Sequence, residues 1–171
     1  MDPNTGKGMV NKLSKKQGMQ LLKQEKFKRK TLSFYRYVIL DNINKLRDDL
    51  YADWIKFGVL GRIYLAHEGI NAQLSVPENN LKEFQANVNA NKYFTNMLFK
   101  IAIEDNGESF FKLTIKVRKQ IVADGLKIDE YDVTNVGMHL TAGQWNKAME
   151  NGATVVDMRN HYESEIGKFK G

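Results

Sequence analysis

Cysteine is absent from this 171-residue chain, and its absence excludes several kinds of chemistry at once. Disulfides, cysteine–zinc sites and a thiol nucleophile cannot form within these residues. The three histidines (His67, His139 and His161) show no paired ligand spacing, so we expect no metal site. No glycine-rich G-x-G-x-x-G fingerprint is present, so the residues indicate no dinucleotide and leave any organic cofactor unknown.

Long apolar runs are also missing. None approaches the roughly 18 residues that a membrane-spanning helix needs, and the N-terminus lacks the apolar core of a signal peptide. We therefore expect a cytoplasmic protein that makes no contact with a membrane.

Acidic residues are scarce in residues 1–31. This leader holds nine basic residues and two acidic ones, whereas the rest of the chain holds 17 basic and 18 acidic residues. The net charge of +6 therefore belongs to the leader. A basic arm can hold RNA phosphates through counterion release. The alternative is a solubilising extension, and we predict a largely disordered leader with a short helical pattern at Lys15–Lys28.

Alternating apolar residues predict one α+β domain over residues 32–121. Strands are expected at Leu32–Leu40, Arg62–Ala66, Ile70–Val76, Leu98–Ile103 and Phe110–Ile121. One helix is expected between a cap at Asp41 or Asn42 and a stop at Gly58, and another after Pro77. The order strand, helix, strand, strand, helix, strand is that of the ferredoxin-like (βαββαβ) arrangement. Both helices should cover one sheet face and leave the other open.

The last predicted strand carries the clearest candidate for a functional surface. Its apolar residues alternate with Lys112, Thr114, Lys116 and Arg118, as in an antiparallel edge strand with one buried face. Cations beside aromatic rings such as Phe34 suit RNA, because phosphates and unstacked bases are then engaged together. The predicted RNA-binding residues on the open face are Arg36, Arg62, Tyr64, Lys112, Lys116 and Arg118. Docking of another domain, or plain solvation of an edge strand, remains open as an alternative.

The segment His67-Glu68-Gly69 offers an acid and a base at a hairpin tip. No third group can be assigned to orient the histidine. We therefore favour a tight turn in which Gly69 supplies a positive φ.

Residues 122–135 lack periodicity and are expected to be a linker. Beyond them, Thr141–Gln144 fits a capping box at the start of a helix, and Thr154–Met158 has the pattern of a buried strand. Residues 136–171 therefore look like the opening of an α/β domain. A piece this short cannot bury a core of its own.

Three segments, in order, resemble one family. Gly58–Pro77 looks like the signature of the rhodanese-domain tRNA uridine hydroxylases called TrhO, and Phe111–Leu126 is similar to the next block of that family. Val155–Gly167 resembles its rhodanese entry, including the pair Asp157 and Arg159. The resemblance runs from about Phe34 to Gly171.

The resemblance implies a ferredoxin-like domain followed by a rhodanese-like domain, with tRNA as partner. It also implies oxygen-dependent 5-hydroxylation of the wobble uridine, with molecular oxygen as co-substrate. The essential cysteine of the rhodanese loop is then expected beyond Gly171, so this chain alone should hold no catalytic residue and be inactive. Structural roles in the incomplete rhodanese-like domain are implied for Asp157, Arg159 and Gly167. Lys168 stands where rhodaneses usually carry histidine.

Two other functions remain open as alternatives. A rhodanese-type sulfurtransferase would use the same downstream cysteine, and a non-catalytic module would bind RNA or protein without it. Acylphosphatase chemistry is rejected, because the connection Asp41–Asn44 has no glycine for a phosphate cradle.

Overall fold

The computed structural model describes residue 9 and the ranges 11–103, 107–122, 125, 131–158 and 161–168. The chain divides into two compact units, Met1–Asn135 and Val136–Gly171, and each is described by itself. No helix in the described part of the chain combines the length and apolar character needed to cross a membrane.

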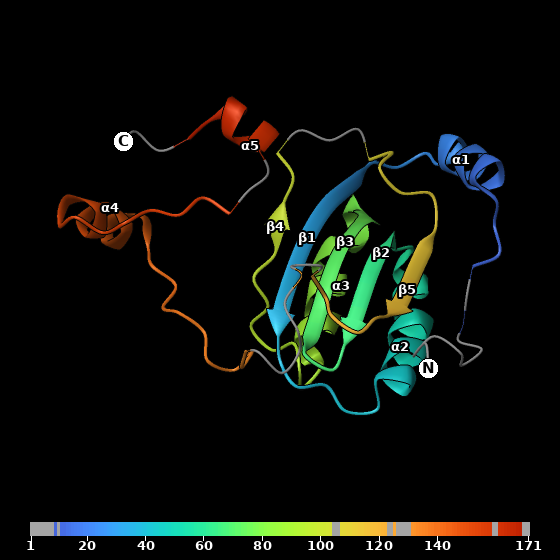
Figure 1. The fold of residues 1–171 in the computed structure, drawn as a ribbon. Helices are drawn as coiled ribbons and strands as arrows, with labels where there is room; N and C mark the ends of the chain where they lie inside the picture. The colour runs from blue at the N-terminus through green and yellow to red at the C-terminus, as the bar shows by residue number, and fades with distance from the viewer. Residues whose placement is uncertain are drawn as a thin grey trace. The chain divides into compact units, whose positions relative to one another are not determined.

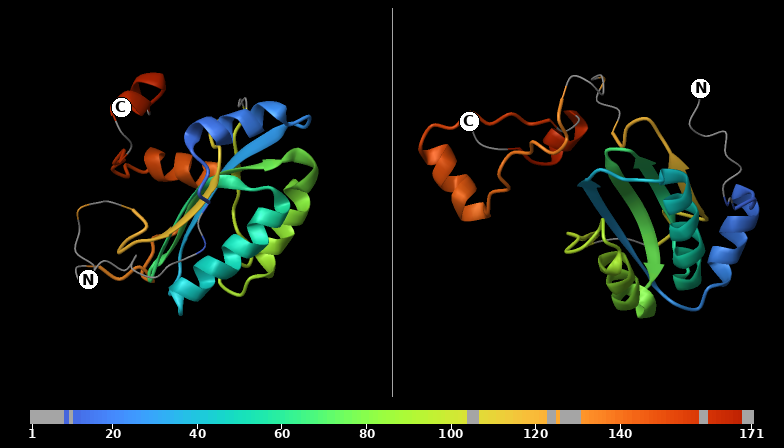
Figure 2. Two further views of the ribbon diagram at one scale, coloured as in Figure 1. Left: turned by 90° about the vertical axis from the view of Figure 1, so that its right-hand side faces the viewer. Right: turned by 90° about the horizontal axis from the view of Figure 1, so that it is seen from below.

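The first unit is built on one five-stranded sheet with the strand order β4-β1-β3-β2-β5 (Figure 1). The strands are β1 (Arg29–Tyr37), β2 (Leu60–Ala66), β3 (Gly69–Pro77), β4 (Lys100–Ile101) and β5 (Leu113–Val117). The helices α2 (Ile43–Trp54) and α3 (Leu81–Ala90) lie on the same side of the sheet (Figure 2). A short 3-10 turn at Ile55–Phe57 follows α2, and another at Glu78–Asn80 precedes α3. The order from β1 to β4 confirms the predicted ferredoxin-like α+β fold.

Two strands differ from the prediction. β5 is a fifth strand, and it pairs with β2 in parallel, from Gly61–Leu113 to Leu65–Val117, so the expected antiparallel edge strand is wrong in direction. Side-chain alternation has a period of two in either direction, so the pattern could not distinguish them. The expected strand at Leu98–Ile103 is reduced to the two residues of β4, and Ile103 is fully exposed.

The core lies between the sheet and the two helices. Alternation sends Leu32, Phe34 and Ile63 toward the helices, where all three are at most 2% exposed. Trp54 of α2 meets Phe34 edge-on at a centroid distance of 6.1 Å and Phe84 of α3 at 5.4 Å. Such edge-to-face contacts stabilise a core beyond simple burial.

The ends of α2 match the predicted residues, although not every predicted interaction. Asn42 occupies the N-cap in a left-handed conformation with φ 47°, and its side chain makes no capping hydrogen bond. Gly58 takes φ 70° after the short 3-10 turn, where a left-handed residue is needed to end the helix.

The leader contains a helix, α1 (Lys15–Gln24), with a capping box between Ser14 and Gln17. Gly18 packs so closely on the first unit that a Cβ there would lie 2.7 Å from Cδ2 of Phe111. Arg29 donates twice to the Glu25 carboxylate, at 2.7 Å each. The short helix expected within Lys15–Lys28 is therefore confirmed as α1, while residues 1–8 and 10 lie outside the described residues.

The second unit holds α4 (Ala142–Glu150) and α5 (His161–Ile166). The predicted capping box is confirmed, because Thr141 and Gln144 bond each other's backbone at the start of α4. Thr154–Met158 is not a strand, and Val156 and Met158 are 71% and 88% exposed. A strand needs a hydrogen-bonded neighbour, and the described residues of this unit supply none. The assignment of residues 136–171 to a rhodanese-like domain, and the other predicted domain limits, stay predictions.

Candidate nucleic-acid interface

The side of the sheet away from α2 and α3, here called the open face, presents its side chains in two rows set by the strand register. The first row runs across four strands through Lys116, Tyr64, Asn71 and Tyr35. The second crosses all five through Thr114, Arg62, Gln73, Ser33 and Lys100. Neighbouring strands are about 4.8 Å apart, so side chains in one row can contact the same ligand.

The charge of the strands is of one sign. They contain no aspartate or glutamate, and their six basic residues are Arg29, Lys30, Arg36, Arg62, Lys100 and Lys116. On the open face the exposed cations are Arg62, Lys100 and Lys116. This concentration of positive charge attracts phosphate groups.

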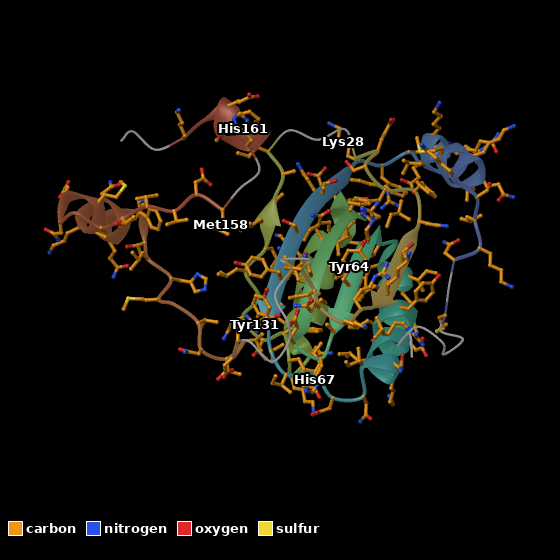
Figure 3. All side chains as sticks on the ribbon, in the orientation of Figure 1. Lys28, Tyr64, His67, Tyr131, Met158 and His161 are labelled. Carbon is orange, nitrogen blue, oxygen red and sulfur yellow. The ribbon has the colours of Figure 1, made fainter. Side chains whose placement is uncertain are left out.

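Aromatic rings lie next to these cations at two places on the open face. The Arg118 guanidinium is 5.4 Å from the centroid of the Tyr64 ring, and the Lys100 ammonium is 5.8 Å from that of Tyr35. Tyr64, labelled on the sheet in Figure 3, is half-buried, and Tyr35 is 51% exposed. Both are cation–π contacts that leave ring surface for a planar group to stack on.

One end of the open face is closed by the chain that follows β5. The Asn71 amide donates to the Ile121 carbonyl at 3.2 Å, and Ile121 is buried. Glu68, at the tip of the β2–β3 hairpin, is 7% exposed and accepts from the Ile121 N–H at 2.7 Å and from the Tyr131 hydroxyl at 3.0 Å. Figure 3 shows His67 and Tyr131 toward this end of the sheet.

These contacts decide the reading of His67-Glu68-Gly69. Gly69 has φ 148°, and a Cβ there would collide with the Arg36 carbonyl oxygen, so the predicted turn is confirmed. The Glu68 carboxylate is committed to two structural hydrogen bonds, and His67 Nδ1 lies 3.0 Å from the Leu40 carbonyl oxygen. The segment anchors the chain after β5 and does not form an acid–base pair.

Toward the other end, Ser109 and Phe110 line two hollows on the open face. One, of about 330 Å³, is bordered by β1 and β4 and includes Thr31, Ser33, Gln73 and Lys100. The other, of about 180 Å³, is bordered by β2 and β5 and includes Arg62, Lys112, Thr114 and Lys116. Each hollow is therefore lined by at least one cation, by polar side chains and by Phe110.

The predicted RNA-binding residues do not all meet on this surface. Arg62, Tyr64 and Lys116 lie together, and Arg118 joins them by stacking on Tyr64. Lys112 lines the smaller hollow and donates to the Leu13 carbonyl at 3.1 Å.

The predicted placement of Arg36 and Phe34 on the open face is wrong. Both share the side of β1 that carries buried Leu32, because residues two apart in a strand face the same way. Phe34 is 2% exposed in the core, and Arg36 donates to the carbonyls of Thr95 and Asn96 in the loop after α3. Tyr35, Lys100 and Gln73 were not predicted, although the alternation in β1 places Tyr35 opposite Phe34.

The remaining predicted residues lie in the second unit. Asp157 and Gly167 are exposed, and Arg159 lies outside the described residues. No group of three His, Asp or Glu side chains within the described ranges could hold a metal ion.

Comparisons with known proteins agree with this architecture. Residues 29–121 match the family described as the UPF0176 acylphosphatase like domain. A protein from Leptospira interrogans named tRNA uridine(34) hydroxylase is 59% identical over 150 residues, which cover 87% of this chain and 41% of the relative. A protein of the same name from Yersinia enterocolitica is 44% identical over 162 residues, which cover 94% of this chain and 46% of the relative.

The chain thus spans less than half the length of these curated relatives. Among solved structures, a BLUF protein, BlrB in its dark state, covers 54% of the chain with 13% identity and a TM-score of 0.40, too low to carry an argument. The family match, in contrast, begins with β1 and extends past β5, taking in all five strands of the sheet. The chain therefore belongs to the UPF0176 acylphosphatase-like domain family.

Proposed function

We propose that the whole protein of which this chain forms part hydroxylates the wobble uridine of tRNA, and that the open face of the first unit contacts the RNA. The names of the relatives support the reaction. The open face supports the RNA contact, because it combines exposed cations with tyrosine rings and its strands carry no acidic residue. Cytoplasmic location and molecular oxygen as co-substrate belong to the same proposal.

The single observation that carries the RNA contact is the cluster of Arg62, Tyr64, Lys116 and Arg118. Lys116 is the cross-strand neighbour of Tyr64, and the Arg118 guanidinium stacks on its ring. A phosphate and an unstacked base can therefore be held side by side. Single-stranded RNA is recognised by this combination of charge and stacking. In this role the first unit binds and orients the substrate and takes no part in bond breaking.

Catalysis is assigned elsewhere in the whole protein. This chain has no cysteine, and the rhodanese-loop cysteine is expected beyond Gly171. Asp157, Arg159 and Gly167 would support the rhodanese-like domain, which would be the partner of the first unit. The acylphosphatase-like family description concerns the fold, and the connection Val38–Asn42 between β1 and α2 has no glycine to build a phosphate cradle.

Charge reversal tests the RNA contact. The variants are Arg62→Glu and Lys116→Glu, and the control is Lys82→Glu, an exposed lysine of α3 on the opposite layer. We expect both test variants to weaken binding of unmodified tRNA and to lower the slope of log affinity against log salt by roughly 0.7–0.9 for each lost phosphate contact. The control should behave like the parent chain.

A test variant that folds normally and keeps its tRNA affinity and salt slope would remove the RNA contact. The reaction is tested separately, by mass spectrometry of 5-hydroxyuridine in tRNA from cells with and without the whole gene. Normal hydroxyuridine without the gene, together with thiosulfate turnover by the whole protein, would favour a sulfurtransferase.

A further inference from the structure

The larger hollow, beside β1 and β4, contains the groups that a nucleobase needs. Ser33 and Gln73 belong to the second row of the open face, and Lys100 follows them in the same row. The exposed Gln73 carboxamide can donate and accept hydrogen bonds at once, as the edge of a base requires. Phe110 provides an aromatic side to the hollow.

Thr31, which lines the same hollow, has a hydroxyl group without a hydrogen-bond partner among the described residues. The Thr31 hydroxyl oxygen is buried and has no hydrogen-bond partner within the described structure, and the same is true of the hydroxyl of Ser75, its cross-strand neighbour. A buried polar group without a partner carries a desolvation penalty that no hydrogen bond offsets. Both hydroxyl oxygens are shielded from solvent, so a ligand in the hollow meets the exposed Gln73 and Lys100 before either of them.

Tyr35 adjoins the hollow and supplies a stacking surface. It lies two residues beyond Ser33 on the same face of β1, it is half exposed, and the Lys100 ammonium sits over its ring at 5.8 Å. The pair repeats the chemistry of Tyr64 on β2 and Arg118, the residue that follows β5. Tyr35 and Tyr64 are both register partners of Asn71, so the two rings are two strand spacings, or about 10 Å, apart.

We propose that Tyr35, Gln73 and Lys100 form a second nucleotide subsite, which takes an unstacked base and its phosphate from a single-stranded RNA segment that crosses the sheet from β5 to β4. This rests on the proposed function and extends it from a charged surface to a pair of stacking positions. Tyr35 stacks on the base, Gln73 and Ser33 bond its edge, and Lys100 holds the phosphate. Recognition of bases in a loop, and not of a duplex, follows from this geometry.

The test compares two probes on the whole 171-residue chain: a seven-residue oligouridine RNA, and an oligomer of the same length with abasic riboses. Tyr35→Ala should weaken binding of oligouridine about fivefold or more, since stacking contributes roughly 1–3 kcal/mol per base. It should leave binding of the abasic oligomer unchanged. Lys100→Glu should weaken both, and Tyr35→Phe, which keeps the ring, should bind like the parent.

The matched control is Lys92→Glu. The Lys92 ammonium lies 4.6 Å from the Tyr93 ring after α3, so this variant removes the same kind of pair away from the open face. Circular dichroism and urea unfolding check that each variant folds. If Tyr35→Ala binds oligouridine like the parent, or weakens both probes equally, the subsite is wrong.

The outcome also separates this proposal from the one it rests on. Loss of binding with Lys116→Glu but not with Tyr35→Ala would leave an RNA surface without the second subsite. No binding of tRNA or oligouridine by the folded parent chain would remove both proposals.

Discussion

The two faces of one sheet use the same strands for opposite purposes. On the covered face, Phe34 and Trp54 pack edge-on and the single arginine, Arg36, donates to loop carbonyls. On the open face an aromatic residue and an arginine are also present, but Tyr35 and Arg62 are accessible to solvent. Residue type therefore does not assign an aromatic or an arginine to the core or to a binding surface, whereas its odd or even position along the strand does.

Substitutions of two adjacent residues on opposite faces of β1 should differ most in their effect on stability. Phe34→Ala should lower the free energy of unfolding by about 3–5 kcal/mol, because it leaves a cavity beside Trp54. Tyr35→Ala should change it by less than about 1 kcal/mol, because the side chain is half exposed. Urea denaturation followed by tryptophan fluorescence measures both. Equal losses for the two variants would mean that the faces are not distinct.

A smaller effect is expected for the two arginines. Arg36→Ala should cost about 0.5–1.5 kcal/mol of unfolding free energy, because the exposed carbonyls of Thr95 and Asn96 lose a charged donor that water partly replaces. Arg62→Ala should leave stability nearly unchanged and weaken RNA binding. The same denaturation series, combined with tRNA binding of each folded variant, checks the pair. A reversed result, with Arg62 needed for stability and Arg36 for binding, would contradict the assignment of faces.

The smallest effect concerns charge in the helix layer, where α2 carries Asp48, Asp49 and Asp53. A hydrogen bond from Arg47 holds the pKa of Asp48 below its usual value of 3.8, helped by the N–H of Met9 and opposed by partial burial. A carboxyl group with a lowered pKa contributes stability above its unfolded pKa and loses it as the pH falls through its folded pKa. Asp48→Asn should therefore be slightly less stable than the parent at pH 7.

That difference should shrink as the pH falls below about 4, where the unfolded chain takes up a proton at Asp48 before the folded chain does. Urea unfolding of the parent and of Asp48→Asn at pH 7 and pH 3 measures this difference in stability. The control is Asp49→Asn, because Asp49 pairs with Lys45 on the exposed side of α2. A constant difference between parent and Asp48→Asn at both pH values would show that Asp48 does not titrate as described.

Much of the fold could be predicted from the sequence, because alternation and helix stripes are local. The stripe that ends at Gly58 and the alternation in Ile70–Val76 gave α2 and β3 to within a few residues. The direction of β5 could not be predicted, because a parallel neighbour is chosen by chain connection and not by side-chain pattern. The start of α1 is marked locally by the capping box of Ser14 and Gln17. Its docking on the first unit could not be predicted, because it depends on a contact between the distant residues Gly18 and Phe111.

The candidate site was predictable in part for the same reason. Arg62, Tyr64 and Lys116 were found because each lies on the polar side of a clear strand. Tyr35 was missed because its neighbours Phe34 and Arg36 were assigned to the open face, which is the wrong parity for β1. Lys100 was missed because it belongs to a strand of two residues, whose pairing with Ser33 is visible only once the sheet is assembled. Thr154–Met158 failed as a strand because a pattern of buried residues does not supply the hydrogen-bonded neighbour that a strand requires.

The Glu68 anchor changes how much of the chain after β5 can act as a tether. Counted from Val117, the stretch to Val136 could extend to about 65 Å, whereas counted from Tyr131, which Glu68 holds, it extends to about 17 Å. A single carboxylate at a hairpin tip thus ties two points of this connection, Ile121 and Tyr131, to the β2–β3 hairpin. A chimera that joins a foreign domain after Tyr131 keeps both contacts, and one that joins it after Val117 leaves Glu68 without these two donors.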